Sequence, residues 1–206
     1  MNRASCPRLP EAAILDAVLA DIAACRACAG ELPHEPRPVV RVFPETRLLI
    51  CGQAPGRRVH ESGLPFTDPS GDRLRTWMGV DSATFYGDRR IGVAAMAFCF
   101  PGTDPKGGDY PPPRRCAHLW RPRLLAELPN VEITLLVGAY AQAWALGPRA
   151  RPTLRETVAA WREYLPAYLP MPHPSWRNTF WLKRNPWFEA EVTPYLRGRV
   201  AAILAP

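Results

Sequence analysis

Residues 47–56 read RLLICGQAPG, a short apolar run that stops in a turn rich in glycine and proline. A run of this length, bounded by turn residues, is typical of a strand buried within a sheet. Two further apolar runs, IGVAAMAF at 91–98 and EITLLV at 132–137, are also followed by glycine or proline. The three runs therefore predict three buried strands.

Helical patterns occupy the intervals around these strands. The expected helices span residues 10–24, 116–128, 140–146, 153–164 and 186–203. Strands that alternate with helices predict an α/β fold, with a parallel sheet covered on both faces. Ligands of such sheets usually bind beyond the carboxyl ends of the strands. The GQAPG loop at 52–56 and the HPSWRN loop at 173–178 fall in positions of this kind.

The size and composition are those of an ordinary globular protein. With 206 residues, of which 47% are hydrophobic and 22% charged, the chain suits one core, so we interpret residues 1–206 as a single domain. No run approaches the roughly 20 apolar residues of a membrane span, and the amino end lacks a signal-peptide core. We therefore expect a cytoplasmic protein with no membrane partner.

The charge favours an anionic partner. The net charge is +7, with 26 basic residues that are nearly all arginine. A basic surplus of this size is compatible with nucleic acid as the partner. Many arginines together with 25 prolines also fit a GC-rich genome, so the charge alone does not identify the partner.

Four of the six cysteines have the spacing of a metal site. These four are Cys25, Cys28, Cys99 and Cys116. The first pair forms C-x2-C at the end of the first expected helix, and disulfides are rare in cytosolic proteins, so metal binding is preferred. Four thiolates suit either zinc or a 4Fe-4S cluster, and spacing does not separate the two. We expect Cys51 to be a core residue and Cys6 to lie on a loose end.

Three motifs resemble those of the uracil-DNA glycosylase superfamily. GQAPG at 52–56, followed by GLPF at 63–66, is similar to the first motif, in which a strand ends in a G-x-x-P turn near a base-stacking Phe. HPSWRN at 173–178 resembles the second motif, in the Arg-Asn variant of single-strand-selective members. The cysteine pattern resembles the iron-sulfur branch. The motifs occur in order over about residues 20–180.

This resemblance implies a fold and a reaction. The fold is a three-layer α/β/α sandwich around a four-stranded parallel sheet. The activity is that of a monofunctional DNA glycosylase, which excises uracil or another deaminated base by hydrolysing the N-glycosidic bond in base excision repair. The resemblance favours a 4Fe-4S cluster on the four cysteines over zinc. The expected partner is DNA containing a damaged base, and we expect a monomer.

The resemblance also implies roles for individual residues. His173 donates a hydrogen bond to the base carbonyl as negative charge develops there, Phe66 stacks on the flipped base, and the backbone N–H groups around Gln53 and Ala54 bind a second carbonyl. The other expected base-binding residues are Pro55, Gly56 and Asn178. The expected DNA-binding residues are Ser175, Trp176 and Arg177. Two alternatives stay open: Asn178 shapes the pocket or holds its loop, and Trp176 contacts DNA or packs internally.

The chain departs from the family at two functions. Gln53 and Ala54 stand where family members carry water-activating acids, and the uracil-reading Asn is replaced near Ala94. The nearest residues that could replace the water-activating general base are His60, Glu61 and Asp68. His60 is the first choice, because an imidazole with a pKa of about 6.5 accepts a proton at neutral pH. A dissociative cleavage needs little help from a base.

Two other functions compete with this interpretation. One is a non-catalytic zinc-containing nucleic-acid-binding protein. Colourless purified protein with one bound zinc would favour this alternative. The other is a nucleotide hydrolase on the same sheet. That activity requires a phosphate-cradling loop, and the sequence contains neither G-x-x-x-x-G-K-[ST] nor G-x-G-x-x-G.

Overall fold

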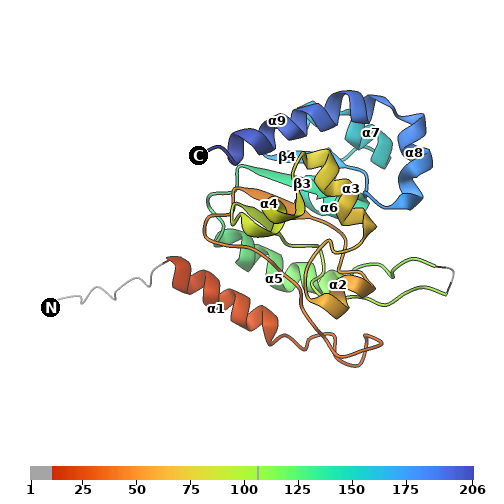
Figure 1. Ribbon diagram of the computed structural model, residues 1–206. Helices are drawn as coiled ribbons and strands as arrows, with labels where there is room; N and C mark the ends of the chain where they lie inside the picture. Colours follow the sequence, from red (N-terminus) through yellow and green to blue (C-terminus); the bar gives the residue numbers. More distant parts are fainter. Residues whose placement is uncertain (1–10, 106) are drawn as a thin grey trace.

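A parallel sheet forms the centre of the molecule. The computed structural model describes residues 11–105 and 107–206. The sheet has the order β2-β1-β3-β4, and every neighbouring pair of strands is parallel. The strands are β1 (Leu48–Cys51), β2 (Ile91–Val93), β3 (Ile133–Val137) and β4 (Tyr168–Met171). Because they run in one direction, their carboxyl ends lie along the same edge of the sheet (Figure 1).

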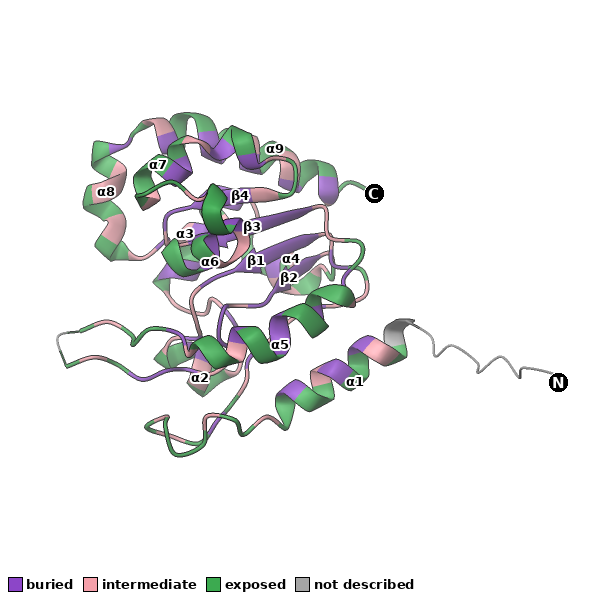
Figure 2. Cartoon of the chain, turned by 180° about the vertical axis from the view of Figure 1, so that it is seen from behind, coloured by how far each residue is buried: buried purple, intermediate pink, exposed green. Residues whose placement is uncertain are grey.

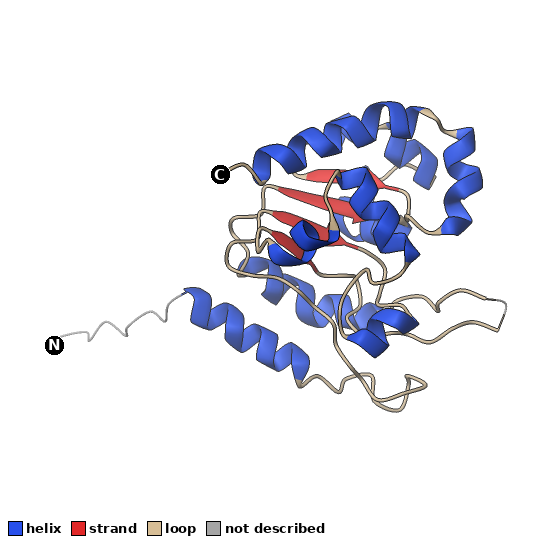
Figure 3. Cartoon of the chain, in the orientation of Figure 1, coloured by secondary structure: helices blue, strands red, loops and turns tan. Residues whose placement is uncertain are grey.

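Helices lie on either side of this sheet (Figure 3). The α-helices are α1 (Glu11–Ala23), α2 (Arg57–Ser62), α3 (Pro69–Met78), α4 (Ser82–Gly87), α5 (Arg114–Ala126), α6 (Ala139–Leu146), α7 (Leu154–Ala159), α8 (Thr179–Arg184) and α9 (Thr193–Ile203). Shorter turns are the 3-10 helices η1 (Gly147–Arg149), η2 (Trp161–Tyr164) and η3 (Trp176–Asn178), and the π-helix η4 (Phe188–Val192). None of the helices in the described ranges is long and apolar enough to cross a membrane.

Alternate residues of the strands face opposite helical layers. Leu48 and Ile50 pack in a core with residues of α3, α4 and α9. Leu49 packs with residues of α1 and α5, and Cys51 with residues of α5 and α6. Both faces are therefore buried, as the apolar runs predict, and Figure 2 shows the strands buried between the helices. The expected three-layer α/β/α sandwich around a four-stranded parallel sheet is confirmed.

The second strand is shorter than the sequence predicts. The expected strand at 91–98 ends at Val93, and the chain beyond it remains bonded to the turn after β1. The Met96 N–H donates to the Gly52 carbonyl at 2.9 Å, and the Ala97 N–H donates to the Gln53 carbonyl at 3.1 Å. Residues 94–98 are therefore apolar because most of them pack in the interior, although they do not belong to the strand.

The fourth strand escapes prediction from the residue pattern. Its sequence, YLPM at 168–171, contains Pro170 and follows Pro166. A proline argues against a central strand because it lacks a backbone donor. β4 lies at the edge of the sheet next to β3, where a proline is tolerated.

Close packing against α3 fixes the backbone of Phe66. A Cβ on Gly71 would lie 1.9 Å from the Phe66 carbonyl oxygen, so a glycine is needed there. The φ of Phe66 is 57°, in the left-handed region that residues other than glycine rarely adopt. The same carbonyl accepts hydrogen bonds from the Tyr86 hydroxyl at 3.0 Å and from Arg75 at 3.1 Å. These contacts hold Phe66 in a strained conformation of the kind found at functional sites.

We expect Gly71→Ala to destabilise the fold by about 1–3 kcal/mol, because the added methyl group overpacks against backbone. Gly198→Ala in α9 is the matched control, since a Cβ there meets nothing within 4 Å. A helical Gly→Ala change in open space should leave stability unchanged or raise it by up to about 1 kcal/mol. Thermal unfolding followed by circular dichroism measures both. Equal melting temperatures for Gly71→Ala and the wild type would contradict the close approach.

Candidate active site

Loops that follow three of the strands meet at one pocket. Its lining comprises Val39, Gly52, Gln53, Ala54, Pro55, Gly56, Val59, Pro65, Phe66, Asp68, Ser70, Val93, Ala95, Asp109 and His173. The two motif loops, 120 residues apart in sequence between Gln53 and His173, thus contribute to the same cavity. The structure brings together six predicted site residues, which are Gln53, Ala54, Pro55, Gly56, Phe66 and His173.

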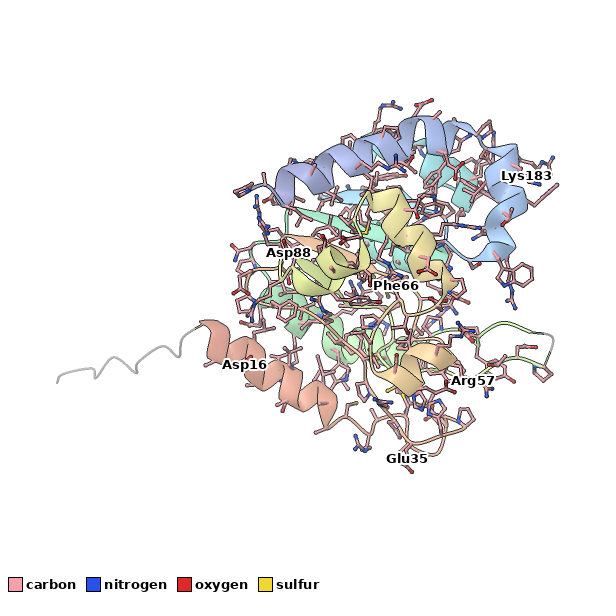
Figure 4. All side chains as sticks on the ribbon, in the orientation of Figure 1. Asp16, Glu35, Arg57, Phe66, Asp88 and Lys183 are labelled. Carbon is pink, nitrogen blue, oxygen red and sulfur yellow. The ribbon has the colours of Figure 1, made fainter. Side chains whose placement is uncertain are left out.

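Phe66 lies toward the middle of the molecule (Figure 4) and presents its ring to this pocket. A Cβ on Gly52 would lie 3.8 Å from the tip of the ring, so the turn after β1 approaches the aromatic edge closely. The ring packs edge-on against Phe85, with centroids 6.3 Å apart and planes at 88°. A flat group entering the pocket therefore meets an aromatic face held in place from behind.

His173 is a neutral hydrogen-bond donor in this arrangement. The residue is only half-buried, yet protein atoms surround its imidazole, and burial lowers its pKa, with the nearby Asp68 carboxylate opposing the shift. Nδ1 accepts the Ser175 N–H at 3.2 Å. An acceptor nitrogen carries no proton, so the proton of the neutral ring lies on Nε2. His173 can therefore donate a hydrogen bond without carrying a charge.

The other residues of the HPSWRN loop lie outside the pocket lining. Asn178 donates to the His173 carbonyl at 2.7 Å, so it holds the loop. Arg73 donates to the Ser175 carbonyl at 3.0 Å and anchors the loop to α3. Trp176 is 74% exposed, and the Arg177 guanidinium lies 5.7 Å from the centre of its ring. Of the two alternatives for Trp176, internal packing is therefore wrong.

His60 also lies outside the pocket lining. Its ring centroid is 4.0 Å from that of His34 and 6.0 Å from that of Phe100. Burial lowers the pKa of His60. Sequence proximity to the GQAPG turn placed His60 among the candidates, but α2 directs its ring toward the loop that contains His34. Glu61, the next residue on α2, is likewise absent from the lining.

The pocket contains two carboxylates. Asp68, one of the three predicted replacements, caps α3 through the Gly71 N–H at 3.3 Å. Asp109, which the sequence analysis missed, comes from the loop between β2 and α5. Its position in the sequence could have indicated Asp109, because it lies in a loop after a predicted strand, and loops at the carboxyl ends of parallel strands usually line the site. Near the position where the resemblance places a base-reading residue, Ala95 lines the pocket, whereas Ala94 is fully buried against α1 and α5.

The four predicted metal ligands line one apolar cavity between α1, α5 and the loop after β2. All four are free thiols. Two of them accept hydrogen bonds, Cys25 from Trp120 Nε1 at 3.3 Å and Cys116 from the Phe98 N–H at 3.4 Å. Cys51 is buried in β1 as expected, and Cys6 lies outside the described residues.

Burial raises the pKa of Cys99 to about 12 and that of Cys116 to about 11. Both thiols therefore keep their protons at neutral pH unless a metal displaces them. Within residues 11–105 and 107–206, no three His, Cys, Asp or Glu side chains converge closely enough to hold a single metal ion. The four thiols nevertheless line the same cavity.

Comparison with known proteins identifies a family and solved structures of similar fold. The family model of the uracil DNA glycosylase superfamily matches residues 40–197. A solution NMR structure of a candidate uracil DNA glycosylase from Methanosarcina acetivorans is similar at 18% identity and a TM-score of 0.47, covering 79% of this chain and 97% of that one. The family match spans both motif loops and well over half of the sequence, so this chain belongs to the uracil DNA glycosylase superfamily.

Proposed function

We propose that this protein is a monofunctional DNA glycosylase that excises uracil, or another deaminated base, by hydrolysing the N-glycosidic bond. The observation that carries the proposal is the pairing of Phe66 with the neutral imidazole of His173 in one pocket. An extruded base needs a stacking surface and a hydrogen-bond donor, and this pair supplies both. The decisive experiment incubates the protein with oligonucleotides containing uracil, hypoxanthine or xanthine and looks for alkali-labile abasic sites.

The chemistry follows from where charge develops. When the glycosidic bond breaks, its electron pair goes to the base and negative charge grows on the base carbonyl oxygens. A donor already aimed at such an oxygen lowers the barrier, because it needs no reorganisation during the reaction. His173 is proposed as this donor through Nε2–H. The backbone N–H groups of the turn at Gln53 and Ala54 are proposed to bind the second carbonyl.

The pocket supports a broad choice of base. The amide with which the superfamily reads uracil is missing near Ala94, and Ala95 presents a methyl group to the pocket. A side chain that hydrogen-bonds the substrate gives strong discrimination, and a methyl group gives little. Excision of hypoxanthine or xanthine in addition to uracil is therefore part of the proposal.

The iron-sulfur branch is the proposed subgroup, with Cys25, Cys28, Cys99 and Cys116 as ligands of one 4Fe-4S cluster. A zinc ion requires four sulfurs within about 2.3 Å of one point, whereas a cluster keeps its thiolates apart by its own width. The four thiols line one cavity, as the ligands of a single cluster would. N–H donors to the sulfurs, as at Cys25 and Cys116, tune such sites. The cluster would tie α1 to α5.

We expect Cys99→Ala to abolish the brown colour and the iron content and to lower the melting temperature, because binding energy at such a site is folding energy. Cys51→Ala is the control. It removes a buried thiol of β1 that contacts Met96, so it should keep the iron and lose only about 1 kcal/mol of stability. Colourless wild-type protein with one zinc would favour the non-catalytic zinc-binding alternative.

A surface of aromatic and basic residues next to the pocket supports contact with DNA. Trp176 and Phe180 are 74% and 68% exposed, and Arg177 and Arg184 lie over their rings. Exposed aromatic side chains stack on bases, while arginines meet phosphates. This surface is proposed to hold the strand on both sides of the extruded nucleotide.

DNA affinity should fall steeply between about 50 and 200 mM salt, because phosphate contacts release counterions. Arg177→Ala should reduce the slope of log K against log salt by about one. Arg199→Ala removes the same charge from α9, where Arg199 pairs with Glu132 at the opposite edge of the sheet, and should leave the slope unchanged. Fluorescence anisotropy with labelled oligonucleotides measures all three. A salt-independent affinity would contradict a DNA substrate.

We expect His173→Ala to lose roughly two to three orders of magnitude in single-turnover excision rate, the scale of a deleted oxyanion donor, with DNA affinity nearly preserved. Phe66→Ala should instead weaken capture of the flipped base by about 1–3 kcal/mol, the stacking contribution of one base. His118→Ala is the control, because His118 lies on α5 against Trp144. A wild-type excision rate in His173→Ala would remove this residue from the mechanism.

A further inference from the structure

We propose that Asp109 is a catalytic carboxylate of this pocket and takes the place of the acid that Gln53 and Ala54 do not provide. The inference rests on the proposed glycosylase function and assigns a role to a loop outside both motifs. Figure 1 shows that loop, between β2 and α5, projecting past α2 from the carboxyl edge of the sheet.

Backbone hydrogen bonds return this loop to the pocket. The Tyr110 N–H donates to the Gly102 carbonyl at 2.9 Å, and Thr103 forms an antiparallel bridge with Asp109. The side chain of Asp109 then lies over the GQAPG turn, since its Oδ2 is 3.5 Å from the position that a Cβ on Gly56 would occupy. A carboxylate thus stands beside the first motif although the motif itself contains none.

Both motifs hold this loop. Gln53 Nε2 donates to the Tyr110 carbonyl at 3.1 Å, so the predicted catalytic residue Gln53 positions the neighbour of Asp109. From the second motif, an Arg177 nitrogen lies 3.5 Å from the Gly107 carbonyl oxygen. These ties connect the loop that carries the carboxylate to both motifs, and Asp109 lines the same pocket as Phe66.

Asp109 suits the reaction better than Asp68. Asp68 uses one carboxylate oxygen to cap α3, whereas in the described ranges no hydrogen bond ties the Asp109 carboxylate. Departure of the base leaves a positive charge on the sugar, which a carboxylate stabilises. Water then forms the new C–O bond at the sugar, and its proton passes to the Asp109 carboxylate.

The surroundings of Asp109 suit an acceptor of that proton. Asp109 is exposed at the mouth of the pocket, yet nearby protein atoms desolvate its carboxyl group and raise its pKa. Arg177 and Arg57, the latter labelled on α2 in Figure 4, oppose this shift, while Asp68 adds to it. His173 is the other titratable group of the lining. The ionised carboxylate is the active form, so the rate should fall as the pH decreases. Because the pKa of Asp109 is raised, this fall should occur at a higher pH than for an ordinary Asp.

The test compares Asp109→Asn and Asp109→Glu with Asp16→Asn, which removes the same charge from the exposed face of α1. Single-turnover excision from a uracil oligonucleotide should fall by about 100-fold or more in Asp109→Asn, the scale of a lost general base. DNA affinity should stay equal or rise, because a negative charge is removed. Asp109→Glu should keep part of the rate, and Asp16→Asn all of it.

The pH profile separates catalysis from loop structure. The acid limb of the wild-type rate should be absent in Asp109→Asn and present in Asp16→Asn. An active wild type whose rate and acid limb both survive Asp109→Asn would overturn the proposal for Asp109 and leave the glycosylase function intact. A wild type that excises none of the tested bases would overturn the proposed function itself.

Discussion

Two hydrogen bonds between the chain after β2 and the turn after β1 connect the functional parts of this protein. The Met96 and Ala97 N–H groups donate to the carbonyls of Gly52 and Gln53. On one side of this connection lie the GQAPG turn and the pocket. On the other side the chain runs two residues further to Cys99. The backbone that leads to Cys99 is thereby bonded to a turn that lines the pocket, so the position of the cysteine loop and that of the turn depend on each other.

Much of the fold could be predicted from the sequence because it depends on burial. The strands β1 and β3 are mostly apolar and buried at every position, as expected of strands covered on both faces. β4 could not be predicted in this way, because Pro170 interrupts its short apolar run and a proline is more typical of a loop than of a strand. The sequence analysis also did not predict α2, α3, α4 and α8. Three of them, α2, α4 and α8, span only 6 residues each, so they show less than two turns of helical periodicity.

The resemblance grouped His173, Phe66 and the GQAPG turn, and the structure brings them to one pocket. The prediction was weaker where tertiary packing decides. His60 follows the first motif closely, yet its ring lies against those of His34 and Phe100. Asp109 is 53 positions beyond Gly56 in the sequence, and only the return of a loop brings it back to the turn. Resemblance assigned the four cysteines to a cluster; the structure adds that they line one cavity.

Pro170 has a consequence beyond the difficulty of predicting β4. The carbonyls of Ala167 and Met171 accept hydrogen bonds from β3, so these odd-numbered residues face the sheet. Pro170, between them, faces the open edge, and its ring replaces the N–H that would point outward. A strand from another molecule would find no donor at the middle of this edge, and missing donors of this kind discourage edge-to-edge association of sheets. The proline thereby disfavours pairing of β4 with a strand of another molecule.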